Sequence, residues 1–262
     1  MTTARSAAIN GAELKDVDSR VYVLGTSCDA PKETQQGAAF GGRSGQRVTV
    51  NRREYLDIKV TFGIDIRKEH LNERSEVFEL CMAWAALARE GAWITIGSKK
   101  DRQIWARTYQ LPAEGDQWQW ASQYTIVFRA WEAPWWQATE PITIRRSGVS
   151  SLQQQISVTG NRRTVLDFEF TNTSGSTINA LSISTGSATM AFTGLGLADR
   201  STLAITHRED GLLQIRINGV SALAFRTPES DNDLWIDPGV PTVHITAGGA
   251  GTIQMGSYGR FE

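Results

Sequence analysis

The chain has 262 residues, 40% of them hydrophobic, which is enough for one large or two ordinary folded domains. Its 27 basic and 28 acidic residues nearly cancel, so net charge gives no argument for a nucleic-acid or anionic-membrane partner. Apolar runs are far shorter than the roughly 18 residues that span a bilayer, and the first residues contain no apolar signal segment. We therefore expect neither membrane insertion nor a signal peptide.

The first elements in chain order are short strands and a loop. A strand is expected at 20–24, and the glycine-rich stretch 34–45 is expected to be a flexible loop. A strand is expected to begin at 46–50. Residues 55–66 then alternate apolar and polar side chains without interruption, which predicts a long strand with one buried face and one face open to water or a partner.

A single helix is expected from Asn72 to Glu90, with Asn72 as N-cap and Gly91 just after the C-terminus. Its apolar positions recur at steps of three, four and seven, which predicts a broad face packed on the sheet. The residues of this face are Leu71, Val77, Phe78, Leu80, Cys81, Trp84, Ala85, Leu87 and Ala88. Cys81 is expected to be a buried thiol, and neither Cys81 nor Cys28 has the spacing of a metal site.

Residues 93–97 and 103–111 are expected to form a hairpin, and 117–131 alternates as another strand region.

The amino-acid composition then changes. Eight of the nine tryptophans precede residue 140 and all lysines precede residue 101, whereas the remainder is rich in Ser, Thr and Gly. We place the domain boundary near 138–151 and divide the chain into domains at 1–140 and 141–262.

The second domain is expected to contain about ten short strands, with no helix, in a jelly-roll β-sandwich. The segments 242–246 and 252–258 are expected to be two separate strands. Asp210-Gly211 and Asn218-Gly219 predict two-residue hairpin turns, and a further turn is expected at 237–239. The predicted fold class is thus mainly β: a sandwich-like or barrel-like unit with one α-helix, followed by a second β-sandwich.

No constellation of residues predicts catalysis, and we expect the protein not to be an enzyme. His70, His207 and His244 are expected to be solvated and form no ligand pair, and nucleophile-elbow and phosphate-loop motifs are absent from the sequence. Asp167 and Glu169 share one strand face about 7 Å apart, within the range of a catalytic carboxylate pair, but such alternation is ordinary on an exposed strand. No metal or cofactor is predicted.

Two groups of side chains are candidates for binding. Exposed tryptophans can stack on sugar rings or anchor a protein interface, although some must be core residues; the candidates are Trp118, Trp120, Trp135 and Trp136. A basic cluster at Arg43, Arg47, Arg52 and Arg53 could meet DNA phosphates, but it is better explained as a solvated or interface loop, since the chain as a whole is not basic.

The order of these elements resembles the distal tail protein family of long, non-contractile-tailed phages. The resemblance rests on the alternating strand, the helix, the hairpin that follows, and the closing pattern of the chain. In that closing pattern a Leu-Trp-Ile-Asp-Pro-Gly-Val turn at 234–240 precedes final strands with Tyr258, Arg260 and Phe261. These motifs are structural, and they extend as a pattern over nearly the whole chain.

The resemblance implies a structural role in the virion tail, with assembly in the host cytoplasm. The first domain would form a hexameric ring that continues the tail-tube channel for DNA, between the tube protein and the tail hub. The second would be a galectin-like domain. Strand addition to a neighbouring subunit would use residues 34–53 and the edge of the 55–66 strand; the interface candidates are Arg43, Arg47, Arg52, Arg53, Tyr55, Asp57 and Lys59. The alternative is a carbohydrate-binding β-sandwich used in host-surface recognition.

Overall fold

The structure is a computed structural model that describes residues 5–39, 46–65, 73–113, 122–208 and 211–261. It divides into two compact units, Met1–Trp135 and Trp136–Glu262, whereas the sequence places the boundary at 140–141. Within the described ranges strands predominate in both units and α1 (Glu73–Ala86) is the one α-helix. The predicted fold class, mainly β with one helix in the first unit, is confirmed. None of the described helices has the length and apolarity to cross a membrane.

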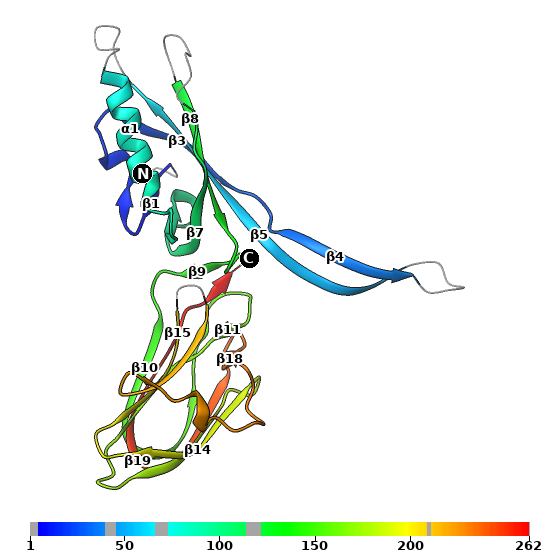
Figure 1. Cartoon of the computed structure of the whole chain (residues 1–262), viewed down its shortest axis with the longest axis vertical. Helices are drawn as coiled ribbons and strands as arrows, with labels where there is room; N and C mark the ends of the chain where they lie inside the picture. The colour runs from blue at the N-terminus through cyan, green and yellow to red at the C-terminus, as the bar shows by residue number, and fades with distance from the viewer. Residues whose placement is uncertain (1–4, 40–45, 66–72, 114–121, 209–210, 262) are drawn as a thin grey trace. The chain divides into compact units, whose positions relative to one another are not determined.

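The first unit is built on one antiparallel sheet with the strand order β2-β1-β6-β7-β8-β5-β3, and β4 pairs with the part of β5 that precedes this sheet (Figure 1). Two short 3₁₀ helices, η1 (Leu14–Asp16) and η3 (Gly97–Lys99), connect strands. The strands are β1 (Ala7–Ile9), β2 (Ala12–Glu13), β3 (Val21–Cys28), β4 (Lys32–Ala39), β5 (Gln46–Ile64), β6 (Ala92–Ile96), β7 (Arg102–Gln110) and β8 (Ser122–Ala130).

Strand β5 supplies the core of this sheet. Its inward side chains Leu56, Ile58, Val60, Phe62 and Ile64 are all at most 4% exposed. Strand β5 pairs with β8 from Leu56 onward and also with β3 from Ile58 onward. The alternation predicted from the sequence is therefore confirmed over the residues that the structure describes.

Two expectations for this region are wrong. The predicted strands at 46–50 and 55–66 are one continuous strand of 19 residues. The stretch 34–45, predicted to be a loop, provides residues 34–39 of strand β4, which pairs with β5 from Lys32–Tyr55 to Ala39–Gln46. Glycine and polar residues have low strand propensity, but a paired strand satisfies their backbone hydrogen bonds, and strand propensity depends strongly on such context.

Helix α1 packs its buried side chains against the sheet. The Phe78 ring lies 4.8 Å from that of Tyr124, and Trp84 meets Phe128 edge to face at 5.9 Å. Cys81 is fully buried, as predicted, and burial raises the pKa of its thiol to about 12. The helix contacts β5 along the sheet and thereby closes the first core.

The helix is shorter and its apolar face narrower than predicted. It ends at Ala86 rather than Glu90, because the next amides bond to carbonyls three residues back, as in Arg89 N to Ala86 O at 3.0 Å. Leu80 and Leu87 are 47% and 56% exposed, so they do not belong to the core. The predicted positions Leu71 and Asn72 lie outside the described residues. The hairpin predicted after the helix is confirmed by the pairing of β6 with β7.

The second unit consists of antiparallel strands and one 3₁₀ helix, η4 (Leu223–Phe225), within the residues described. Its long strands are β10 (Ile142–Gln155) and β19 (Thr242–Ser257), which pair with each other along most of their length. The other strands are β9 (Trp136–Ala138), β11 (Thr164–Val165), β12 (Asp167–Asn172), β13 (Ile178–Ser184), β14 (Thr189–Leu197), β15 (Thr202–His207), β16 (Leu213–Ile217), β17 (Val220–Ser221), β18 (Trp235–Ile236) and β20 (Arg260–Phe261).

Strand β19 joins two layers of this unit. Its first part pairs with β13 at Leu181–Ala247 through Ser184–His244, whereas its last part pairs with β12 at Asn172–Gly251 through Asp167–Gly256. Strand β14 extends the first layer, and β15, β16 and β17 extend the second. Side chains from both layers form one hydrophobic cluster, which includes Phe168, Phe170, Leu181, Ile183, Met190 and Phe192. The two layers therefore enclose a single core, as in a β-sandwich.

Two more expectations are wrong here. The boundary expected near 138–151 lies between Trp135 and Trp136, and much of the 138–151 segment belongs to strand β10. The two strands predicted at 242–246 and 252–258 are one strand. The intervening Ala-Gly-Gly-Ala-Gly sequence indicates a turn only when it is read locally. In the structure a Cβ atom on Gly251 would lie 2.3 Å from Cζ of Phe170, so glycine is needed for the strand to pass this core ring.

The predicted turns agree with the structure where it describes them. Asn218 and Gly219 have φ angles of 48° and 86°, and they join the paired residues Ile217 and Val220. This is the conformation of a two-residue hairpin turn. Gly239, in the predicted turn at 237–239, has φ 105° and pairs with Val158 through two backbone hydrogen bonds of 2.8 and 2.9 Å. Asp210 lies outside the described residues.

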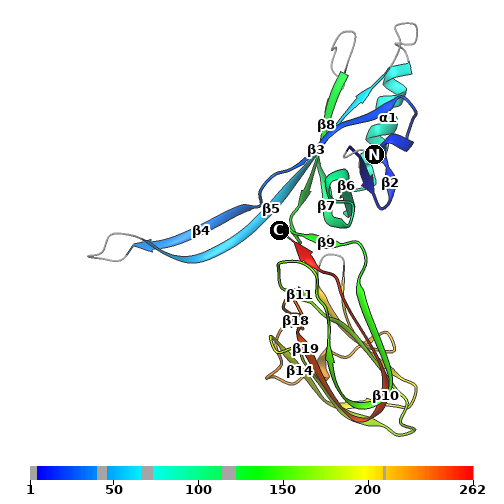
Figure 2. The ribbon, with the colours of Figure 1, turned by 180° about the vertical axis from the view of Figure 1, so that it is seen from behind.

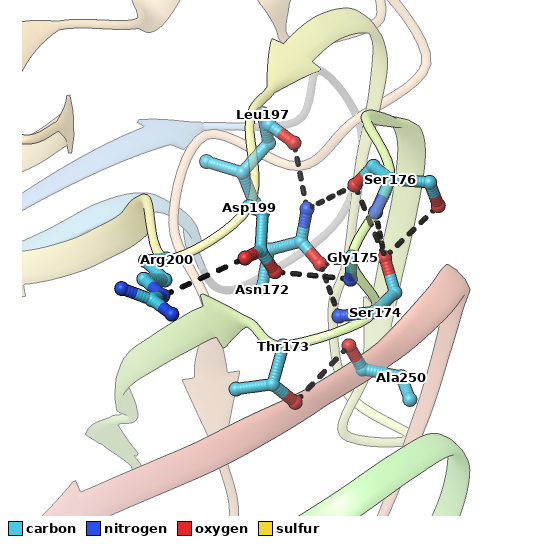
Figure 3. Close-up of polar contacts among 9 residues, drawn as sticks. All are labelled: Asn172, Thr173, Ser174, Gly175, Ser176, Leu197, Asp199, Arg200 and Ala250. Carbon is cyan, nitrogen blue, oxygen red and sulfur yellow. Dashed lines mark hydrogen bonds and ion pairs between the residues drawn. The ribbon is translucent and has the colours of Figure 1, made fainter.

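Asn172, at the end of β12, organises the loop that follows (Figure 3). Its fully buried amide donates to the carbonyls of Ser176 (2.7 Å) and Leu197 (2.8 Å), and its side-chain oxygen accepts from N (2.9 Å) and Oγ (2.8 Å) of Ser174. Gly175 N donates to Asp199 at 3.0 Å from the facing segment. One asparagine side chain thus satisfies the polar groups of two connecting segments.

Candidate functional site

Strands β4 and β5 form a two-stranded extension of the first sheet, here called the arm (Lys32–Ala39 with Gln46–Tyr55). No third described strand pairs with it, and both figures of the whole chain show a ribbon of two strands alone (Figures 1 and 2). A two-stranded hairpin by itself is marginally stable in water, and its unpaired edges can accept a strand from another chain. The arm is therefore the strongest candidate for an assembly surface.

An ion pair marks the place where the arm meets the sheet. Asp57 on β5 lies directly opposite Arg129 on β8. Nε and Nη2 of Arg129 donate to the two carboxylate oxygens of Asp57 at 2.6 and 2.8 Å. The two side chains are only 14% and 15% exposed, and the hydrogen bonds that Arg129 donates to Asp57 raise the pKa of Arg129 above its ordinary value. Two parallel bonds of this kind fix the orientation of both side chains.

Aromatic rings from both neighbouring strands lie over this guanidinium group. The Arg129 carbon Cζ is 3.9 Å from the ring centre of Tyr55 on β5 and 3.5 Å from that of Tyr109 on β7. Trp131 meets Tyr109 edge to face at 5.9 Å, and these two rings remain 42% and 49% exposed. We call Tyr55, Asp57, Tyr109, Arg129 and Trp131 the Arg129 cluster. Because Tyr55 is the last residue of the arm, the cluster ties the arm to the sheet.

The rest of the outward face of the first sheet is polar, and its charged side chains pair with neighbours of opposite charge. Lys59 donates to the Asp29 carboxylate at 2.8 Å, and both side chains are more than two fifths exposed. That hydrogen bond raises the pKa of Lys59. Thr61 and Thr125 share a hydrogen bond of 3.1 Å, and Arg107 pairs with Glu132 at 2.9 Å. Exposed pairs of this type contribute little to stability, so this face is suited to contact with water or a polar partner.

The binding and interface residues predicted from the sequence lie in different parts of the structure. Tyr55 and Asp57 belong to the Arg129 cluster, and Lys59 lies two residues further along β5. Arg47, Arg52 and Arg53 lie on the β5 strand of the arm, opposite Ala38, Thr34 and Glu33, but their side chains are outside the described part of the structure. Arg43, Trp118 and Trp120 are outside it altogether.

The two remaining tryptophans differ in exposure. Trp135 is half-buried, whereas Trp136 is fully buried, so Trp136 does not contribute to an exposed aromatic platform as the sequence suggested. Trp136 pairs with Phe261 between strands β9 and β20. Its large apolar ring is used for packing.

Sequence reasoning missed Arg129, Tyr109 and Trp131. A signal existed in the alternating stretch 117–131, where Tyr124, Ile126 and Phe128 fall on one face of a strand. Arg129 and Trp131 then fall on the other face. What the sequence did not contain was the strand pairing. Only the register of β8 with β5 and β7 places these side chains beside Asp57 and Tyr55.

The expectation that His207 is a solvated hairpin-tip residue is wrong. Its side chain is 6% exposed, with Nδ1 2.7 Å from the Asp167 carboxylate and Nε2 2.6 Å from that of Asp233. Burial lowers the pKa of His207, but the hydrogen bonds to the two carboxylates raise it more, to about 9. Both ring nitrogens are occupied, so the imidazole has no free position for general acid or base chemistry. His244 is exposed on β19, as predicted.

We expect the substitutions Asp57→Asn and Arg129→Lys to loosen the arm. Both remove the two-bond pairing, and lysine also loses the flat surface that covers Tyr55 and Tyr109. Since the pair is partly screened by solvent, the expected loss of stability is about 1 to 2 kcal/mol. Hydrogen–deuterium exchange of residues 32–39 and 46–55 should become faster.

The substitution Lys59→Gln is the matched control, because it removes an exposed ion pair from the same strand and should leave exchange in the arm unchanged. Equal acceleration in this control, or none in the two cluster variants, would show that the Arg129 cluster does not restrain the arm.

Comparisons with known proteins give matches at the level of structure. No family model and no curated protein sequence matches the chain. The crystal structure of the Dit protein (gp 19.1) of phage SPP1 matches with a TM-score of 0.72 at 14% identity, over 98% of this chain and 99% of that one. The chain has the fold of the SPP1 Dit protein.

The SPP1 Dit protein is described as a paradigm of the hub adsorption apparatus in phages that infect Gram-positive bacteria. A chain of the phage p2 baseplate, in its activated conformation with strontium, also matches, with a TM-score of 0.53 at 9% identity over 97% of both chains. The similarity extends over both units of the chain. At the level of fold, the resemblance inferred from the order of elements is confirmed.

Proposed function

We propose that the chain is a structural protein of a phage tail, which forms a hexameric ring at the distal end of the tail tube. The observation that carries the proposal is the arm, whose strand edges have no partner within the described chain, on a fold shared with the SPP1 Dit protein. A protein that acts alone does not normally leave a paired ribbon of this length without a covering element, because exposed edges promote association.

Ring closure requires two different surfaces on each subunit. In the proposed ring the arm of one subunit adds a strand to an exposed sheet edge of its neighbour. The edge strands of the first sheet, β2 and β3, are the acceptors available within the described residues. The Arg129 cluster holds the arm at its point of departure, which lowers the entropy lost when the arm docks.

Each unit and partner has a role in this proposal. Domain 1–140 forms the ring and continues the tail tube, and the galectin-like domain 141–262 decorates the ring. The tube protein binds one face of the ring and the tail hub the other, and DNA passes through the central channel during infection. The protein is assembled in the host cytoplasm and resides in the virion tail. In this proposal the protein has a structural role and no enzymatic one.

Removal of the arm should abolish the ring and leave the fold intact. Lys32 and Tyr55 lie opposite each other in the ladder, so residues 33–54 can be replaced by Asn-Gly, which closes a two-residue hairpin. We expect the intact chain to form particles of roughly six times 28.9 kDa and the shortened chain to be a monomer by light scattering.

The control replaces Asn218-Gly219 by Asp-Gly, which preserves a hairpin turn in the second unit and should preserve the ring. Negative-stain electron microscopy shows whether particles have six-fold symmetry and a central hole. A shortened chain that still forms such rings would refute the role of the arm, and an intact chain that remains a monomer even with tube protein would refute the ring.

A further inference from the structure

An open depression of about 200 Å³ lies on the outer face of the second unit, and neither the core nor the proposed ring uses it. It spans strands β10, β12, β15 and β19. The side chains that line it point away from the core, because Phe168, Ile205 and Met255 alternate with them and are buried. Its polar lining consists of Thr143, Asp167, Glu169, Thr206, Gln254 and Tyr258.

The depression exists because a side chain is missing from the middle of the sheet. Gly256 lies between Thr143 on β10 and Asp167 on β12 in the strand register. Glu169 and Gln254 face each other in the next row of the same pair of strands. Any larger residue at position 256 would fill the space between these four polar groups.

The lining residues favour a ligand that donates several hydrogen bonds. None of the lining residues is basic, and the exposed Arg145 of β10, which lies opposite Gln254 in the strand register, is not among them. Asp167 already binds the buried His207, so its charge is compensated, while Glu169 has no ion pair within the described residues. Carboxylate, amide and hydroxyl oxygens remain as acceptors for several hydroxyl groups, and Pro141 and Tyr258 add apolar surface at one side.

We propose that this depression binds one ring of a neutral saccharide. Ring hydroxyls donate to Glu169, Asp167 and Gln254, and the C–H face of the sugar packs on Tyr258. A site for drug-sized ligands has about 300 to 1,000 Å³, so the smaller volume here suits a single sugar unit. Such a small and open site binds weakly, with an expected Kd of about 1 mM.

The test is saturation-transfer difference NMR on the full chain with glucose, galactose and N-acetylglucosamine. This measurement detects weak ligands of a large particle, so it is valid for a monomer or a ring. At least one sugar should give transfer, and Glu169→Gln and Gly256→Val should each weaken its binding at least tenfold. A Cβ at position 256 meets only ordinary contacts at 3.4 and 3.7 Å, so the valine variant is expected to fold.

Two substitutions provide matched controls. Glu229→Gln removes an exposed carboxylate elsewhere in the unit, and Gly248→Val fills a position on the other part of β19; both should leave sugar binding unchanged. The proposal is overturned if no sugar gives transfer, or if transfer persists in both site variants. It is also overturned if n-butylamine binds in a Glu169-dependent way and the sugars do not, because the site would then recognise a cation.

Discussion

Replacing Asn172 by aspartate is expected to lower the free energy of unfolding of the second unit by about 3 kcal/mol. The carboxylate keeps the acceptor for Ser174 but loses both donors, so its oxygen faces the carbonyls of Ser176 and Leu197 at distances of 2.7 and 2.8 Å. Each carbonyl left without a donor in a buried site costs about 1 to 3 kcal/mol, and a buried charge adds to this.

The effect can be measured by calorimetry together with hydrogen exchange of residues 166–184. For a unit of this size the melting temperature should fall by about 10 °C. The variant should recover part of its stability in acid, because protonation of the new carboxyl removes the charge and restores one donor. Asn179→Asp is the control, since Asn179 is exposed and its side-chain oxygen only accepts from Gly196 N, which aspartate also does. Equal destabilisation by both substitutions would contradict this account.

The second unit is expected to lose stability in alkali through His207. The folded pKa is raised from 6.5 to about 9, so the protonated form is stabilised by folding. This contribution is fully present below pH 6.5 and is lost as the pH rises through 9. Since each unit of pKa shift corresponds to about 1.4 kcal/mol, the loss should amount to about 3 kcal/mol.

Urea unfolding of the second unit at intervals between pH 6 and pH 10 measures this loss. In His207→Gln the unit should be less stable at neutral pH, because the Asp167 and Asp233 carboxylates lose their shared cation. Its free energy of unfolding should also decrease less between pH 6.5 and pH 9 than that of the intact protein. His244→Gln removes an exposed histidine from the same unit and should keep the slope of the intact protein. If His207→Gln keeps that slope too, the pH dependence arises from other groups.

The sequence by itself determined those features that depend on alternation and local chemistry. The inward face of 56–64, the existence of the helix and the Asn218-Gly219 turn follow from side-chain periodicity and from the few residues that tolerate positive φ. The order of these elements was enough to indicate the fold that the SPP1 Dit protein shares. Cys81 could be placed in the core because its neighbours on the helix are apolar.

Only the tertiary structure decided the features that depend on pairing between distant segments. Residues 34–39 and 142–151 lack a strong strand signal, and they become strands because β5 and β19 supply their hydrogen bonds. The glycines at 248–251 indicate a turn in the sequence but in fact allow one strand to pass Phe170 and join two layers. Likewise, Asp57 and Arg129 are 72 positions apart, and His207 is 40 positions from Asp167 and 26 from Asp233. No local sequence pattern connects residues at these separations, so the ion pair and the burial of His207 depend on the tertiary structure.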